Sequence, residues 1–463
     1  MGSLAIDGLI SGLNTTDLIN QLMSVEAQPQ TLLKNKVSTT QTLVSAFQSL
    51  NTSVASLASY AKATALPTAA NLFTATSSAS SVSVTAGTSS TPGQIDLSVT
   101  SVAKTQVSVT AAMSQWPDSP ATFTIVKADG TKVELTARST AMADIADAIN
   151  SSSAGVKASR VAAGTNGTDP LYRLQLSSSA TGTAGSFQVF RGTAGEVTGG
   201  TATNLLTSTG AATVQSASDA SVTLWAGTAA EQVITSASNT FTDILPGVNV
   251  TVSKVEASPV SITVAKDTAA VSKLAENLVA NLTSVFNFIG SKSTVTQGTD
   301  SSGSPTTSAG VFTGNSTVRD VNERIMSAAT APVNGRSPSE IGISITKDGG
   351  VTYDSAKFTA ALANDPVGTQ AMLQTISDRV ATAADSASNQ YTGSITQVIT
   401  GQQSSLKSLG DQIDSWDVRL ASQRAGLERT YSALEVSLSN LQAQSSWLTS
   451  QLAGLSSSTG STS

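Results

Sequence analysis

The sequence predicts a multidomain α+β fold in which both termini form a helical coiled-coil stalk and an antiparallel, β-rich head is inserted between them. Three observations support this prediction. Leucine or isoleucine recurs every seven residues from Leu406 to Leu455. Apolar residues also follow helical spacing between Leu18 and Ala61, near the other end of the chain. Between these two regions the apolar period changes to two, which is typical of strands.

Composition limits both the cores and the partners. The chain has 463 residues, of which 39% are hydrophobic but only 4% aromatic, so we expect several domains packed mainly with small aliphatic side chains. The 25 basic residues do not form a run, and 31 acidic residues outnumber them. A nucleic-acid partner is therefore not expected. No apolar run approaches the roughly 18 residues of a membrane span, so we expect no membrane insertion.

Histidine and cysteine are both absent from the sequence. This excludes Ser-His-Asp and Cys-His catalysis, HExxH zinc sites and disulfides. A Ser-Lys nucleophile or carboxylate chemistry remains open, but nothing places a particular serine beside a particular lysine. We therefore expect a protein that is not an enzyme and that has no cofactor and no metal site.

The stretch "ISGLNTTDLINQLMSVEAQP" at residues 10–29 predicts a capped amphipathic helix. Its candidate N-cap residues are Asn14, Thr15 and Thr16. Asp17 follows near the positive end of the helix dipole, and Pro29 stops or kinks the helix. The apolar residues at helical spacing are Leu18, Leu22 and Val25. A second helix follows and is expected to end before Pro67.

The same N-terminal segment does not read as a cleaved secretion signal. Such a signal needs a positively charged start and an unbroken apolar stretch. The first basic residue here is Lys34, and polar residues interrupt the apolar ones. We therefore predict no cleaved signal peptide.

The C-terminal heptads predict a coiled coil, although an ordinary helical bundle core remains the alternative for any single residue. The repeating positions are Leu406, Ile413, Leu420, Leu427, Leu434, Leu441, Leu448 and Leu455. From the two ends of the chain we select candidate partner-binding residues: Leu18, Leu22, Leu427, Tyr431, Leu434, Leu438, Leu441 and Leu448.

The middle of the chain alternates apolar and polar residues over several runs. Examples are "GQIDLSVTSVAKTQVSVT" (93–110), "ATFTIVKADGTKVELTAR" (121–138) and "GVNVTVSKVEASPVSITVAK" (247–266). Asp129 and Gly130 supply the positive φ that a tight hairpin needs. One short helix, "AMADIADAINSS", interrupts the strands, and longer helices return from about residue 268.

These patterns divide the chain into four parts. The expected parts are an N-terminal helical leg at 1–70, an inserted β-rich head at 71–266, a helical and mixed stalk domain at 267–395, and a C-terminal coiled-coil leg at 396–463. The head is expected to contain two subdomains, about 71–110 with 240–266, and 111–239. Because both ends are helical, the two termini are expected to lie side by side.

Several separated stretches also resemble one known family in their order and spacing. They are "GLISGLNTTDLINQLMSVEAQP", "GQIDLSVTSVAKTQ", "AMADIADAINSSSAGVKAS", "YRLQLSSSATG", "SNTFTDILPGVNVTV", "SEIGISITKDGGVTYDSAKFTAAL" and "LQAQSSWLTSQL". With these stretches the sequence resembles the flagellar filament capping proteins, the FliD or hook-associated protein 2 family, over nearly its whole length. The family's middle domains vary, so details at residues 190–235 transfer poorly.

The resemblance implies a function. Family members leave the cell through the flagellar type III export apparatus, form a ring at the filament tip, and help arriving flagellin to fold and insert without leaking away. The implied partners are flagellin, further copies in a pentamer or hexamer, the hook-filament junction proteins and a cytoplasmic export chaperone. The implied location is extracellular, at the flagellum tip. A surface-exposed adhesin that binds host glycans is the alternative function.

Overall fold

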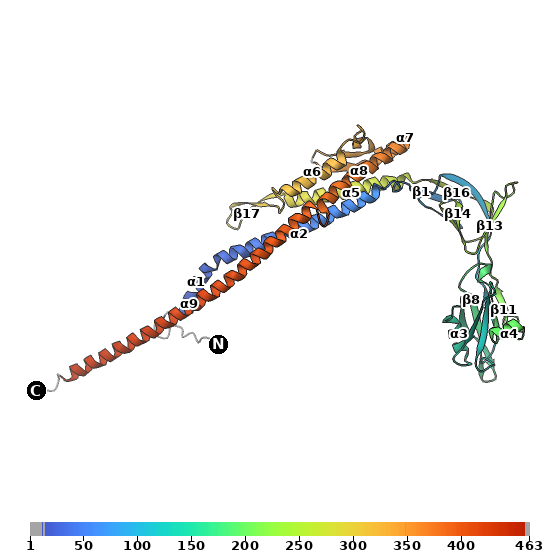
Figure 1. Cartoon of the computed structure of the whole chain (residues 1–463), viewed down its shortest axis with the longest axis horizontal. Coiled ribbons are helices and arrows are strands. Elements are labelled where there is room, and N and C mark those ends of the chain that lie inside the picture. Colours follow the sequence, from blue (N-terminus) through green and yellow to red (C-terminus); the bar gives the residue numbers. More distant parts are fainter. Residues whose placement is uncertain (1–11, 13, 348, 459–463) are drawn as a thin grey trace. The chain divides into compact units, whose positions relative to one another are not determined.

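The structure of the chain is a computed structural model that describes residue 12, residues 14–347 and residues 349–458, with side chains as far as residue 453. The chain divides into two compact units, Met1–Leu66 with Ser272–Ser463, and Pro67–Val271. We call them the helical unit and the β-rich unit and describe each by itself. The predicted α+β class is confirmed, because long helices come from both ends of the chain and antiparallel sheets from its middle (Figure 1).

The helical unit is built from long helices with short hairpins between them. Its helices are α1 (Thr15–Glu26), α2 (Gln28–Thr64), most of α5 (Thr268–Ser293), α6 (Ser316–Thr330), α7 (Ser355–Asn364), α8 (Pro366–Ser388) and α9 (Ser394–Ser458). Its hairpins pair β17 (Val295–Thr299) with β18 (Pro305–Ala309), and β19 (Ile343–Ile345) with β20 (Val351–Tyr353). A 3₁₀ turn, η2 (Pro338–Ile341), precedes β19.

The start of this unit follows the capping rules. The Asn14 side-chain oxygen accepts the Asp17 backbone N–H at 3.0 Å, which confirms the predicted N-cap of α1. Pro29 lies in the first turn of α2, where the missing N–H of proline leaves no hydrogen bond broken. The second helix ends before Pro67, as predicted. The expectation about a cleaved signal concerns residues 1–11, which lie outside the described residues.

An aromatic cluster fixes the centre of the helical unit. Phe47 of α2 is fully buried, and its ring centroid lies 5.1 Å from that of Phe312, just before α6. Phe288 of α5 contacts Phe312 at 6.2 Å. Further along α5, the Leu274 carbonyl accepts a hydrogen bond from the Tyr60 hydroxyl at 3.1 Å. Tight packing of large rings resists change, so α2, α5 and the start of α6 form one rigid body.

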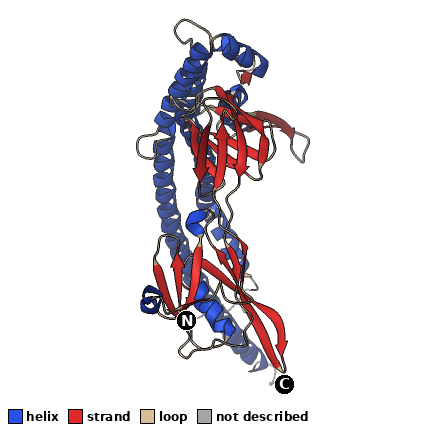
Figure 2. Ribbon diagram, turned by 90° about the vertical axis from the view of Figure 1, so that its right-hand side faces the viewer, coloured by secondary structure: helices blue, strands red, loops and turns tan. Residues whose placement is uncertain are grey.

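The β-rich unit contains two hydrophobic cores. Figure 2 shows in red the strands that surround them. The first core lies between a five-stranded sheet in the order β1-β16-β3-β12-β13 and a three-stranded sheet in the order β14-β15-β2. These strands are β1 (Phe73–Ser77), β2 (Val82–Ala86), β3 (Gly93–Ser101), β12 (Ala220–Leu224), β13 (Gln232–Ser236), β14 (Thr240–Leu245), β15 (Val248–Val252) and β16 (Glu256–Lys266). The core is almost entirely valine, leucine, isoleucine and alanine, as the composition predicts.

The second core lies between two four-stranded sheets and the helix α3 (Met142–Asn150). The sheet orders are β10-β9-β5-β6 and β11-β4-β8-β7. Their strands are β4 (Val107–Val109), β5 (Thr122–Lys127), β6 (Lys132–Thr136), β7 (Val156–Asn166), β8 (Asp169–Ser178), β9 (Phe187–Arg191), β10 (Thr203–Asn204) and β11 (Ala212–Gln215). A 3₁₀ turn, η1 (Thr183–Gly185), and a short helix, α4 (Ala194–Gly199), flank β9.

The head therefore divides differently from the sequence-based expectation. Strands β12 and β13 fall within the expected subdomain 111–239. However, β12 pairs with β3, β13 pairs with β12, and both strands pack against the first core. The apolar residues of β12, Ala220, Val222 and Leu224, alternate with polar ones, but such alternation does not show which sheet a strand joins. The domain boundaries stay a proposal, which we revise in two places. Residues 220–236 join residues 71–103 and 240–266 around the first core, whereas β4, within the expected subdomain 71–110, belongs to a sheet of the second core.

The hairpin between β5 and β6 confirms the Asp-Gly prediction. Gly130 has a φ of 83°, and the Asp129 carboxylate accepts the Thr131 N–H at 2.8 Å. This hydrogen bond lowers the pKa of Asp129 below its ordinary value.

Among the described residues no helix is long and apolar enough to cross a membrane.

Phe123 supports the second core, because its side chain is fully buried and its ring centroid lies 5.4 Å from that of Trp116. We predict that Phe123→Ala destabilises this core by about 3 to 5 kcal/mol through lost contacts and a cavity. Hydrogen exchange of β5 and β9 as a function of urea measures the change. Val161→Ala, at an exposed position of the same unit, is the control; equal loss of protection in both variants contradicts the assignment of Phe123.

Candidate interaction surface on the paired terminal helices

The N- and C-terminal helices of the helical unit pair directly. The Gln30 side-chain amide of α2 donates hydrogen bonds to the Asp417 carboxylate at 2.5 Å and to the Ile413 carbonyl at 3.4 Å. The Arg424 guanidinium donates to the Asn20 side-chain oxygen at 2.8 Å. Asn20 precedes Gln30 in the chain, but it contacts a later residue of α9. The pairing is therefore antiparallel. Figure 1 shows the helices of the two ends side by side.

The face of α1 that contacts α9 differs from the one chosen from the sequence. Ile19 and Met23 are buried, whereas Leu18 and Leu22 are exposed. The sequence analysis missed Ile19 and Met23, although together with Thr15 they repeat every four residues, which is also a helical spacing. Leu18 and Leu22 therefore face outward and are free to meet another molecule.

The heptad residues of α9 fall into two groups. Leu406, Ile413, Leu420 and Leu427 are half-buried, in the part of α9 that lies along α1 and α2. Tyr431 and Leu438 are also half-buried. Leu434, Leu441 and Leu448 are exposed, with Leu441 keeping 60% of its surface accessible. The side chain of Leu455 lies outside the described residues.

The exposed group follows from the lengths of the helices. α1 begins at Thr15, five residues before the Asn20 that meets Arg424. Because paired antiparallel helices advance at the same rise, Thr15 lies opposite about residue 429 of α9. No described helix continues along α9 beyond that point, while α9 itself runs to Ser458.

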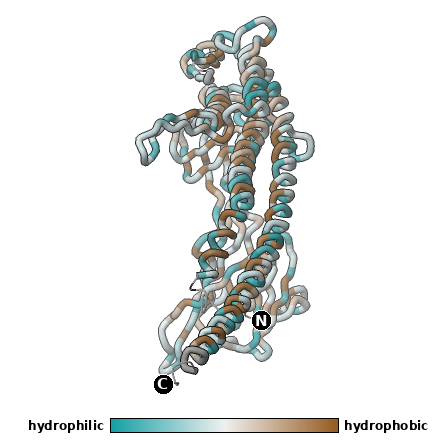
Figure 3. The backbone as a smooth tube through the Cα atoms, turned by 90° about the vertical axis from the view of Figure 1, so that its left-hand side faces the viewer, coloured by the Kyte–Doolittle hydropathy of each residue, from teal (hydrophilic) through white to brown (hydrophobic). Residues whose placement is uncertain are grey.

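We call the apolar residues on the part of α9 beyond this point the distal stripe; all of them except the half-buried Leu438 are exposed. They are spaced by four, three, seven and four residues and so share one helix face: Leu434, Leu438, Leu441, Leu448 and Leu452. In Figure 3 hydrophobic and hydrophilic segments alternate along this helix. An amphipathic helix with an exposed apolar face is suited to pack against another helix.

The charged residues of α9 stabilise the helix itself. The Arg424 guanidinium also meets the Glu428 carboxylate at 3.2 Å, and the Arg419 guanidinium lies 4.8 Å from the Trp416 ring. Asp411, Asp414 and Asp417 follow one another at a spacing of three on α9, and no cluster of potential metal ligands occurs among the described residues. Exposed charges of this kind contribute little energy and leave the apolar stripe as the main feature.

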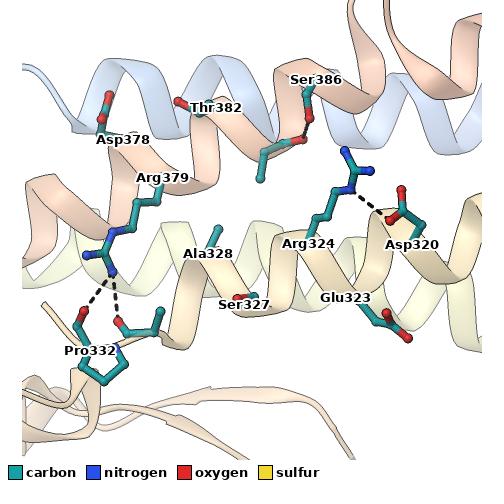
Figure 4. A pocket seen from close by; sticks show the side chains of 12 residues that line it. Asp320, Glu323, Arg324, Ser327, Ala328, Pro332, Asp378, Arg379, Thr382 and Ser386 are labelled. Atoms are coloured by element: carbon teal, nitrogen blue, oxygen red, sulfur yellow. Dashed lines mark hydrogen bonds and ion pairs between the residues drawn. The ribbon is translucent and has the colours of Figure 1, made fainter.

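A polar groove between α6 and α8 was a second candidate site. It has a volume of about 670 Å³ and carries two arginines, both engaged in the helical unit (Figure 4). The Arg379 guanidinium donates to the Ala331 and Pro332 carbonyls, at 3.1 Å each, just after the end of α6. The Arg324 guanidinium contacts the Asp320 carboxylate at 3.0 Å. Arg379 thus caps the end of α6, which is a structural role.

The cap gives a prediction about stability. Arg379→Ala removes two charged hydrogen bonds and leaves helix-end carbonyls without that donor, so we expect a loss of about 1.5 to 3 kcal/mol. The matched control is Arg324→Ala, which removes an exposed pair within one helix and should cost only about 0.3 to 0.5 kcal/mol. Urea unfolding followed by circular dichroism measures both. If the two variants lose equal stability, Arg379 does not cap α6.

Comparison with known proteins identifies the fold. The D1-D2-D3 domains of the flagellar cap protein FliD from Escherichia coli match with a TM-score of 0.57 and 21% identity, covering 77% of this chain and 99% of that one. FliD (HAP2) from Pseudomonas aeruginosa PAO1 matches with a TM-score of 0.35 and 24% identity, covering 46% of this chain and 97% of that one. The first of these matches shows that this chain shares the fold of the FliD D1-D2-D3 domains. A comparison with curated protein sequences gives no match.

The family follows from the sequence models. Residues 11–106 match the flagellar hook-associated protein 2 N-terminus and residues 217–443 match the flagellar hook-associated protein 2 C-terminus. Between them, residues 122–180 match the flagellin hook IN motif. The chain belongs to the flagellar hook-associated protein 2 family. The matched descriptions name parts of the flagellum and no catalytic family.

Proposed function

We propose that this protein is a structural cap at the distal tip of the bacterial flagellar filament. In this role it promotes the folding and insertion of exported flagellin and prevents its leakage. Membership of the hook-associated protein 2 family and a fold shared with a flagellar cap protein support the general role. The distal stripe supports the specific one, because a cap needs a surface that holds the growing tip.

The distal stripe is suited to bind a helical partner. Its leucines lie on one face of a single continuous helix, at the spacing that inserts side chains between those of a second helix. Burial of each leucine contributes about 1.5 to 3 kcal/mol. A few such contacts hold a leg at the tip, yet remain weak enough to break when a new flagellin subunit arrives. Leu18 and Leu22, exposed on α1, extend the proposed partner surface.

The proposal includes the route and the partners that the family implies. The chain leaves the cell through the flagellar export apparatus, accompanied in the cytoplasm by a chaperone that covers the helical seam. At the tip it assembles into a closed ring, a pentamer or hexamer, and meets flagellin and the hook-filament junction proteins. Closure is expected because an open head-to-tail contact would grow into a filament of its own.

Deletion of the gene in its own bacterium tests the capping role. We expect flagellin monomers in the culture medium together with missing or stunted filaments, since nothing retains the exported subunits. Immunoblotting of the medium and electron microscopy of the cells measure the two effects. Normal filaments without released flagellin would show that this chain does not cap growth.

Complementation of that deletion tests the distal stripe. Leu434→Asp with Leu441→Asp places two charges on the stripe, so we predict lost attachment to the tip and released flagellin. The control Val436→Asp changes an equally exposed residue of the same helix segment, about 200° around the helix from Leu434. It should restore filaments as well as the wild type does. Wild-type capping by the double variant would contradict the role of the stripe.

A further inference from the structure

Tyr391 projects from a short break between α8 and α9. Among the large hydrophobic side chains that the structure describes it is the most exposed, at 80%. Hydrogen bonds fix the backbone of the break: the Asn389 side-chain oxygen accepts the N–H groups of Tyr391 and Thr392 at 3.0 and 3.2 Å. The Asn389 carbonyl accepts the Gly393 N–H at 2.9 Å and the Thr396 hydroxyl at 2.9 Å.

Gly393 shows that this break is closely built. A Cβ at this position would lie 2.5 Å from the Asn389 nitrogen and 2.7 Å from the Ala387 carbonyl oxygen, so only glycine fits. A rigid loop that displays an exposed tyrosine is typical of an interface anchor. Tyrosine supplies a large contact area, has two side-chain torsions, and therefore loses little entropy on binding.

The same unit contains an apolar pocket of about 250 Å³ where α5 ends and α6 begins. Its floor consists of Ile289, Phe312 and Val318, all buried. Ser293, Arg319 and Asn322 line it as well and supply polar groups. A cavity of about 150 Å³ already accommodates a benzene ring, so this pocket is large enough for an aromatic side chain.

The pocket is preformed rather than dependent on a ligand. The Phe312 N–H donates to the Lys292 carbonyl at 2.9 Å, and the Phe312 ring packs against Phe47 and Phe288. On the opposite wall the Asn315 side chain caps α6 by accepting the Val318 N–H at 3.1 Å. Such a pocket binds a partner with little loss of conformational entropy.

The chemistry of the pocket matches a phenol. The apolar floor takes an aromatic ring, while N–H groups of Arg319 and Asn322 can donate to a hydroxyl or lie against the ring face. Arg319 is exposed, and none of the ion pairs within the described chain involves it. Tyr391 does not fill the pocket of its own chain, since most of its surface is accessible.

We propose that Tyr391 of one copy inserts into the α5–α6 pocket of a second copy. Tyr391 and the α5–α6 pocket occur on every chain, so two identical copies always supply both sides of the contact. Because the two halves are different surfaces, the contact is heterologous, and such contacts close into rings when the rotation permits. This inference rests on the proposed tip cap and assigns the residues of its ring contact.

Cross-linking of two single-cysteine variants tests the contact, since the natural chain has no cysteine. Tyr391→Cys and Asn322→Cys are mixed as separate full-length proteins and oxidised, so a mixed disulfide dimer can form only between copies. We expect it to form much faster than with Val367→Cys in place of Tyr391→Cys. Val367 belongs to the same unit and is 77% exposed. Equal rates for the two mixtures overturn the proposal.

Self-association provides the second measurement. Tyr391→Ala should weaken it about 30-fold or more, as expected of an anchor residue, whereas Tyr391→Phe keeps the ring and loses much less. Val367→Ala is the matched control and should behave like the wild type. Sedimentation equilibrium gives the constants, and circular dichroism verifies that each variant folds. Unchanged association in Tyr391→Ala overturns the proposal.

The outcome is separable from the capping role. A complete ring that fails to retain flagellin in the complementation assay contradicts the cap while the Tyr391 contact stands. Retained flagellin together with unchanged association of Tyr391→Ala leaves the cap in place and overturns only the contact.

Discussion

The antiparallel pairing of the N-terminal helices with α9 is the contact on which the rest of the helical unit depends. Gln30 with Asp417 and Asn20 with Arg424 fix its register, while Ile19 and Met23 supply its apolar part. The first and last helices of the chain pack together in one unit, and residues 67–271 between them form the other unit. The β-rich unit is therefore an insertion into a helical protein.

The two units reach stable cores in different ways. The helical unit concentrates its aromatic rings around Phe312, where the connection from α5 to α6 has to be held. The β-rich unit relies on period-two strands of valine, isoleucine and leucine, and its buried rings, which include Trp116, Phe123, Phe187 and Phe241, are divided between its two cores. Small aliphatic side chains fill two thin cores more readily than one thick one, which agrees with the division into two sets of sheets.

The surfaces proposed for function share one physical property, namely apolar groups left exposed by a rigid scaffold. The distal stripe exists because α9 is longer than its described partners. Tyr391 is exposed because the break between α8 and α9 turns it outward. The α5–α6 pocket keeps its shape because the Phe312 ring packs against Phe47 and Phe288. Charged groups serve other purposes: Arg379 ends α6, and Arg424 joins α9 to α1. The proposed ring assembly and the proposed binding of a helical partner would depend on such apolar contacts more than on charge.

The sequence alone determined the class of fold, the Asp129–Gly130 hairpin and the family, because each depends on local spacing or on a short motif. It limited the N-cap of the first helix to Asn14, Thr15 or Thr16, and the structure selected Asn14. Heptads likewise indicated one long C-terminal helix. Only the tertiary structure decided which face of α1 meets α9, since Leu18 and Ile19 begin equally good helical stripes. It also decided that β12 and β13 join the first core, because alternation does not name a strand's neighbour. Tyr391 and its pocket had no sequence signal, as both arise where distant segments are brought together by packing.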